Sequence, residues 1–337
     1  MTHLPSPGPT VGSDPLPGLV WAFRIHDDGG AEELAVDRPI EPRHDGWLWL
    51  HFNLADARGC AFLKAFPDLP EEAIEALVGP DTHQQLQADS ACVYGVIADL
   101  GRDFEGITEE IRLLHFAMTE RCLVSARRRA LNAVEATRQA LRGGRRLESV
   151  ASLLDLIVDH IADAIDRLAD DLAVQMDRIE ERILDRETAG DRQRLGAFRR
   201  TTVRLHRQLS GLRALFHRLE AQDPEALSPP LRLEAGRLSQ RLDGLDHEID
   251  ALRDRARLLQ DEISSQLVEE TNRNLRALSI VTILFLPPTL MAGFFGMNLK
   301  GMAFSDHDLG FWSGVVASVV SSVATYLVLR WRGLTRG

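Results

Sequence analysis

The chain has 337 residues and a formal net charge of −11, with 50 acidic against 39 basic side chains. This length suggests two or three structural units rather than one core. The acidic balance argues against a nucleic-acid partner, because such proteins present basic side chains to phosphates. Cys60, Cys92 and Cys122 lie far apart and form no CxxC pair. The sequence therefore predicts neither a disulfide framework nor a structural zinc module, and we expect reduced thiols in the cytoplasm.

The first 17 residues contain five prolines and no apolar signal-peptide core. We expect 1–17 to be a disordered tail rather than a signal peptide. Short aromatic and β-branched runs follow, together with a helix start near Pro70, and they predict a cytoplasmic α/β domain over 18–145. The sequence has no glycine-rich dinucleotide fingerprint, no P-loop and no catalytic constellation, so we expect neither a nucleotide ligand nor an enzyme.

Residues 146–230 predict an antiparallel pair of helices, with a turn over 186–191. One side of the first helix carries five aspartates at spacings of three and four residues: Asp155, Asp159, Asp163, Asp166 and Asp170. Such a row concentrates cations or holds a regulatory metal ion. The alternative, and the more usual meaning of a charged helix face, is a solvated surface partly offset by neighbours such as Arg167.

Residues 231–277 carry a heptad pattern that predicts a long stalk helix. One apolar series recurs every seven residues from Leu238 to Leu259, and a companion series runs from Leu242 to Ile263. Neither proline nor glycine occurs from 245 to 286. We therefore expect one continuous helix that runs from the stalk into the segment that follows.

Two segments without charged side chains, 278–295 and 309–329, flank a 13-residue loop over 296–308. As helices they would span about 27 Å and about 31 Å, close to a bilayer core of about 30 Å. They predict an antiparallel transmembrane hairpin; the alternative is a buried soluble helix broken at Pro287 and Pro288. Arginines precede the first span and recur in the basic tail 330–337, which places both termini in the cytoplasm.

A row of small, hydroxyl and polar residues, here the polar stripe, follows one face of the stalk and first span at alternating steps of three and four. Its members are Asp261, Ser265, Val268, Asn272, Leu275, Ser279, Thr282, Leu286, Thr289, Gly293 and Gly296. Such residues line a water-filled ion path or pack membrane helices together. The extension of the stripe into the soluble stalk, through Asn272 to Asp261, favours the path. One hairpin cannot enclose a pore, so several copies must assemble.

The loop between the spans contains His307 between Asp306 and Asp308. An imidazole flanked by carboxylates is a donor set that can gather zinc at the pore entrance. The alternative is an ordinary polar loop.

The first span closes with Gly293-Phe294-Phe295-Gly296-Met297-Asn298. A Gly-Met-Asn triplet that closes the first of two C-terminal spans resembles the CorA family of divalent metal-ion transporters. The resemblance implies a homopentameric funnel in the bacterial inner membrane, with the first span of each subunit lining the pore. It implies an outer mouth formed by Gly296, Met297 and Asn298, and pore positions at Thr289, Asn272 and Asp261.

Two departures from the magnesium-type members of the family bear on which ion the chain would carry. The glutamate that often follows the triplet in magnesium-type members is missing, and Lys300 stands in the loop. The segments GLVWAFRIHDDGG and GWLWLHFN, and the end of the stalk, are similar to the ZntB zinc-transport branch.

We therefore expect an α+β chain that forms a homo-oligomeric, pentameric transporter of a divalent cation, with zinc as the cargo. The ion would pass Thr289, Thr282, Ser279 and Asn272 and leave past Asp261, with Leu286, Leu278 and Leu275 forming a hydrophobic gate. We expect no cofactor apart from the transported Zn²⁺ or Mg²⁺, and as partners only further copies and the bilayer. The alternatives are a CorA-type magnesium or cobalt channel and a membrane-tethered coiled-coil scaffold or sensor that conducts no ion.

Overall fold

The computed structural model consists of two compact units, Met1–Leu258 and Leu259–Gly337. The structure describes residues 15–40, 45–66, 69–80, 83–89, 91–103, 106–184, 190–221, 228–296 and 309–331.

The N-terminal unit begins with a seven-stranded sheet in the order β2-β1-β3-β7-β6-β5-β4. Its strands are β1 (Leu19–Ile25), β2 (Ala31–Leu34), β3 (Trp47–Asn53), β4 (Gln85–Ala88), β5 (Val93–Asp103), β6 (Gly106–Thr119) and β7 (Cys122–Arg127). Neighbouring strands are antiparallel except for β3 and β7, which are parallel. The chain between β3 and β4 forms α1 (Ala57–Lys64) and α2 (Glu71–Val78).

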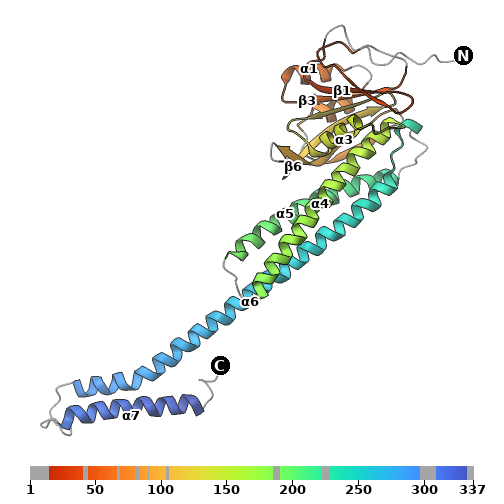
Figure 1. Cartoon of the computed structure of the whole chain (residues 1–337). Coiled ribbons are helices and arrows are strands. Elements are labelled where there is room, and N and C mark those ends of the chain that lie inside the picture. The colour runs from red at the N-terminus through yellow and green to blue at the C-terminus, as the bar shows by residue number, and fades with distance from the viewer. Residues whose placement is uncertain are drawn as a thin grey trace. The chain divides into compact units, whose positions relative to one another are not determined.

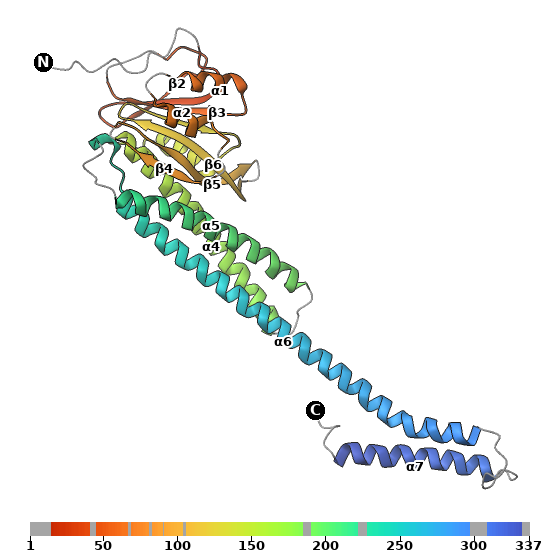
Figure 2. The same cartoon turned by 180° about the vertical axis from the view of Figure 1, so that it is seen from behind.

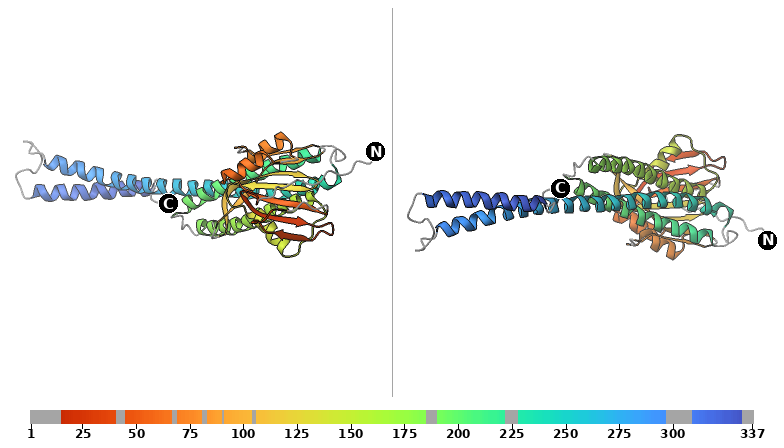
Figure 3. Two further views of the ribbon diagram at one scale, coloured as in Figure 1. Left: turned by 90° about the horizontal axis from the view of Figure 1, so that it is seen from above. Right: turned by 90° about the horizontal axis from the view of Figure 1, so that it is seen from below.

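Both faces of this sheet are covered, as Figures 1, 2 and 3 show. Helices α1 and α2 lie on one face, where Leu50 and Phe52 of β3 join an apolar core with Leu63 and Leu77. Helix α3 (Asn132–Arg142) lies on the other face. Side chains alternate along a strand, so Trp49 and His51 of β3 point to the face that carries α3. A central strand buried on both sides explains the aromatic run that the sequence shows.

Three long helices continue this unit. They are α4 (Val150–Leu184), α5 (Asp191–Glu220) and the first part of α6 (Ala235–Gly296), with a short 3-10 turn, η2 (Pro229–Leu231), before α6. They lie side by side in Figures 1 and 2. The heptad seam of α6 is buried at every position from Leu238 to Ala256. Within this chain, the seam is therefore covered by α4 and α5.

The C-terminal unit contains the rest of α6 and helix α7 (Leu309–Trp331), which lies beside the end of α6 in Figures 1 and 2. Both helices are long and apolar enough to cross a membrane. Helix α6 continues through Pro287 and Pro288. Each proline lacks a backbone N–H, so two helical hydrogen bonds are missing there. The predicted α+β architecture, with a sheet domain, a long helix and an apolar C-terminal hairpin, is confirmed.

Candidate functional site

The polar stripe lies on α6 within the C-terminal unit, and its described side chains are all exposed in a single chain. Even the apolar members are open: Leu286 is 67% exposed and Val268 is 59% exposed. Gly296 is the last residue of α6. Burying such apolar groups is favourable. The stripe therefore faces something that one chain does not supply.

The hydroxyl groups of the stripe are held by the helix itself. The Oγ atoms of Ser279 and Thr282 donate to the carbonyls of Leu275 and Leu278, each at 2.8 Å, and Thr289 donates to Phe285 at 2.7 Å. A hydroxyl has one proton and two acceptor lone pairs. Because each hydroxyl proton is donated to a backbone carbonyl, the hydroxyl oxygen can act only as an acceptor towards the outside of the helix. Such an oxygen suits a cation or its water shell.

The contact between α6 and α7 uses a different face of α6. The half-buried residues of α6 in this region are Ile280, Leu284, Pro287, Pro288 and Met291. At 3.6 residues per turn, their centre lies roughly 150° around the helix from the centre of the stripe. Packing within the hairpin therefore does not account for the stripe.

Helix α7 brings its own small residues to that contact. Its half-buried positions are Gly314, Ala317, Ser318, Ser321, Ser322 and Thr325. Small and hydroxyl residues at such spacing let membrane helices approach closely. A row of small and polar residues can serve helix packing or line an ion path. The row on α7 lies in the contact between the two helices, whereas the polar stripe on α6 lies on an uncovered face.

Several predicted site residues lie outside the described residues: Met297, Asn298, Asp306, His307 and Asp308. Their assigned roles at the mouth and loop stay predictions.

The aspartate row of α4 lies in the N-terminal unit, against α6. Asp159 accepts two hydrogen bonds from Arg237, at 3.0 and 2.9 Å, and one from Arg241 at 2.9 Å. Arg241 also pairs with Asp163. These arginines belong to a segment roughly 80 residues away in the sequence, so the spacing within α4 gave no sign of them.

Asp155 is buried, at 6% exposure, and its two carboxylate oxygens each lie 3.3 Å from the backbone nitrogen of Glu234. Burial raises the pKa of Asp155 to about 7, although the backbone hydrogen bond acts in the opposite direction. This carboxyl group thus holds the chain just before α6 begins.

Asp166 and Asp170 are exposed. The pKa of Glu248 on α6 is raised by burial and then by these two carboxylates. Among the described residues, no group of three or more His, Cys, Asp or Glu side chains is arranged to hold a metal ion. Cation attraction by the row stays a prediction.

Comparison with known proteins decides the family. Residues 44–331 match the family model described as CorA-like Mg²⁺ transporter protein. The chain belongs to the CorA-like family. The resemblance read from the Gly-Met-Asn triplet is confirmed, and the CorA-like proteins are transporters rather than enzymes.

Relatives of this CorA-like chain cover nearly its whole length. The zinc transport protein ZntB of Klebsiella pneumoniae subsp. pneumoniae is 27% identical over 317 residues, which cover 93% of this chain and 95% of the relative. The full-length CmaX protein has a TM-score of 0.78 at 23% identity, covering 95% of this chain and 98% of its own. The CorA magnesium transporter from Methanocaldococcus jannaschii has a TM-score of 0.76 at 16% identity, covering 94% and 98%. At these identities the two solved structures show a shared fold.

Proposed function

We propose that this chain, a divalent metal cation transporter by its family, carries zinc across the bacterial inner membrane along the polar stripe of α6. The observation that carries the proposal is the uncovered stripe, whose hydroxyls donate inwards and present acceptor oxygen outwards. A membrane helix that faced only lipid would gain nothing from such a row. A row of weak acceptors can replace part of the water shell of a passing cation without holding it tightly.

An oligomer follows from what a single chain leaves open. From Ser264 to Ser279, every described side chain of α6 except Gln266 is exposed, including Leu267, Leu275 and Leu278. Apolar side chains that are exposed on a helix favour its association with further copies of the chain. We infer a cyclic homo-oligomer, a pentamer by resemblance to the family, with the stripe of each copy turned to the central axis.

The route through this pore would begin at Gly296, Met297 and Asn298, with the loop over 296–308 outside and both termini in the cytoplasm. Asn298 would offer oxygen to a hydrated ion. The loop residues Asp306, His307 and Asp308 would gather zinc at the entrance.

Leu286, Leu278 and Leu275 lie among the hydroxyl and amide positions of α6. In an assembled pore, rings of leucine would form a narrow gate that closes when water leaves it. Below the gate, Asn272 and then Asp261 would receive the ion on the cytoplasmic side.

Zinc is proposed over magnesium because two relatives that are 27% identical to this chain, over 93% and 90% of its length, are named zinc transport proteins. The glutamate that often follows the triplet in magnesium-type relatives is also missing here, and Lys300 in the outer loop adds a positive charge.

The experiment is cation flux into liposomes that contain the purified oligomer, with zinc and magnesium indicators in parallel and with and without a pH gradient. We expect zinc uptake well above magnesium uptake, and its loss in Asn298→Ala with assembly intact. Magnesium uptake alone would make the chain a magnesium channel. No flux of either ion from an intact oligomer would favour the scaffold.

A further inference from the structure

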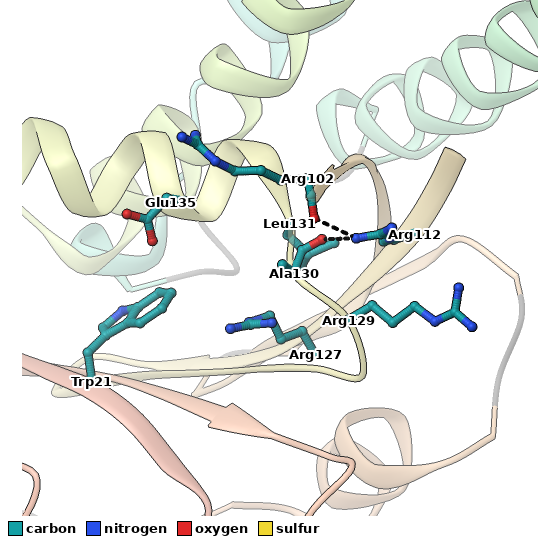
Figure 4. Close-up of a pocket in the computed structure, with 8 residues that line it drawn as sticks. All are labelled: Trp21, Arg102, Arg112, Arg127, Arg129, Ala130, Leu131 and Glu135. Carbon is teal, nitrogen blue, oxygen red and sulfur yellow. Dashed lines mark hydrogen bonds between the residues drawn. The ribbon is translucent and has the colours of Figure 1, made fainter. Parts of the chain in front are cut away.

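A cavity of about 490 Å³ lies in the N-terminal unit, on the face of the sheet that carries α3 (Figure 4). Four arginines line it, Arg102 from β5, Arg112 from β6, Arg127 from the end of β7 and Arg129 just after it. Trp21 of β1 and Glu135 of α3 complete the polar lining. This volume is in the range of about 300–1,000 Å³ that small-molecule sites have.

The four arginines of the lining fall into two pairs that differ in their partners. Arg112 and Arg129 bind the carboxylate of Glu110, at 2.6 and 2.9 Å. Arg112 also donates to the carbonyls of Arg102 and Ala130, both at 2.8 Å. These two arginines are therefore occupied by the protein itself.

Arg102 and Arg127 form the second pair. Among the side chains that the structure describes, neither guanidinium has an ion-pair partner, and Arg102 has no side-chain hydrogen bond. Glu135 is the carboxylate of the lining. It already forms an ion pair with Arg138 and accepts a hydrogen bond from Gln139. The lining therefore holds more positive charge than it neutralises.

Arg127 is aimed by a buried network. Its Nε donates to Nε2 of His51 at 3.0 Å. That bond makes Nε2 an acceptor, so Nδ1 carries the proton and donates to Ser125 Oγ at 2.8 Å. Complete burial and the charge of Arg127 hold the pKa of His51 well below its ordinary value, which keeps the ring neutral.

Because Nε of Arg127 is hydrogen-bonded to His51, the two terminal NH₂ groups of Arg127 remain available to the cavity. The guanidinium of Arg127 points into the space beside Trp21 in Figure 4. A fixed guanidinium fork is the geometry that binds carboxylate or phosphate oxygens in pairs.

Trp21 supplies an independent sign of a ligand. Its side chain is 3% exposed, and its indole N–H has no hydrogen-bond partner among the described residues. Its ring is stacked on His51 at 4.1 Å, and the guanidinium carbon of Arg138 lies 4.8 Å from its centroid. A buried donor without an acceptor is costly unless something fills the site.

We propose that this cavity, here the arginine pocket, binds a small organic oxyanion, a metabolite with a phosphate or carboxylate group, through Arg102, Arg127 and the indole N–H of Trp21. The anion would pair with the two guanidinium groups that have no ion-pair partner among the described side chains, and it would satisfy the buried donor. The pocket belongs to the soluble part of the chain, and this site is independent of the path along α6.

The test is calorimetric titration of the full-length protein in detergent with inorganic phosphate, AMP and citrate, at matched ionic strength and with chloride as the reference. We expect saturable binding of at least one of the three, with one site per chain. Arg102→Gln should weaken it roughly tenfold or more, because a hydrogen bond to a charged group is lost. The Arg102 side chain has no described partner, so this variant should fold normally.

Arg58→Gln is the matched control, because Arg58 is an arginine of the same unit whose side chain is 81% exposed on α1, outside the pocket. Its affinity should equal that of the wild type. Trp21→Phe keeps an aromatic ring and removes the N–H, and it should weaken binding by a smaller factor. The proposal would be overturned if the heats of titration with all three anions equalled those with chloride. It would also be overturned if Arg102→Gln bound the anion with the affinity of the wild type. A change in oligomer mass in Arg102→Gln without anion binding to the wild type would also overturn it, because the pocket would then receive an acidic group of another copy.

Discussion

Asp155 shows how one residue in a charged row can differ from its neighbours. Asp159 and Asp163 face arginines of α6, whereas Asp155 is buried against the backbone N–H of Glu234. A buried carboxylate loses hydration, which disfavours its charged form. The row that looks uniform in the sequence thus contains a titratable group with a pKa of about 7.

This pKa predicts a pH-dependent stability. In the unfolded chain the pKa of Asp155 returns to its ordinary value, so between about pH 4 and about pH 7 the folded state binds a proton that the unfolded state lacks. The contribution of Asp155 to the free energy of unfolding therefore falls as pH rises through this window. An asparagine side chain cannot titrate, so in Asp155→Asn we expect the Tm of the wild type minus that of the variant to be larger at about pH 5 than at about pH 8.

The measurement is thermal unfolding of both proteins across this range. Asp99, whose pKa burial also raises to about 7, is present in both and cancels in the difference. Parallel curves of Tm against pH would contradict the assignment.

At the scale of elements, α6 changes its environment along its length. Its first part packs into a three-helix bundle with α4 and α5, and its last part lies beside α7 with the stripe uncovered. The same helix is thus a core element in one unit and an exposed surface in the other.

The bundle predicts where substitutions in α6 should destabilise the fold. Leu242 is 1% exposed, so Leu242→Ala leaves a cavity and should cost roughly 2–5 kcal/mol. Leu184→Ala is the matched control, because Leu184 at the end of α4 is 75% exposed and should change stability by no more than about 0.5 kcal/mol. Thermal unfolding in detergent compares them, and equal shifts of Tm would count against the bundle.

The elements also show which parts of the fold the sequence could predict. The heptad seam, the two uncharged spans and the aromatic runs of β1, β3 and β5 to β7 carry strong periodic signals, because each buries a defined face. Strands β2 (AEEL) and β4 (QLQA) have four residues each, and two of the four side chains in each strand are polar. Such short strands at the two edges of the sheet give no apolar pattern, and they form because a neighbouring strand offers its backbone groups.

Side-chain partners were the harder part of the site. The stripe could be read from spacing alone, since its members lie on one helix. The partners of Asp159 and the arginine pocket join residues from distant segments, as in Arg127 with His51, 76 positions apart in the sequence. A single sequence contains no period that reports such pairs.

For the whole molecule, the central claim is that copies of this chain enclose an ion path with the stripe of α6. Two membrane helices leave lipid on most sides, so one chain cannot conduct. The exposed apolar residues of α6 and the stripe give the chain both a reason to associate and a polar surface to enclose.

The most direct test compares two threonines on the two faces of the hairpin. Thr282 lies on the stripe and donates to Leu278, whereas Thr325 lies on the half-buried face of α7 and donates to Ser321, both at 2.8 Å. Valine has the same shape as threonine but no oxygen, so we would measure zinc flux into liposomes for Thr282→Val and Thr325→Val, with the oligomer mass checked for each. The account predicts reduced flux in Thr282→Val and flux close to wild type in Thr325→Val. Wild-type flux in Thr282→Val, or a loss only in Thr325→Val, would contradict the path along the stripe.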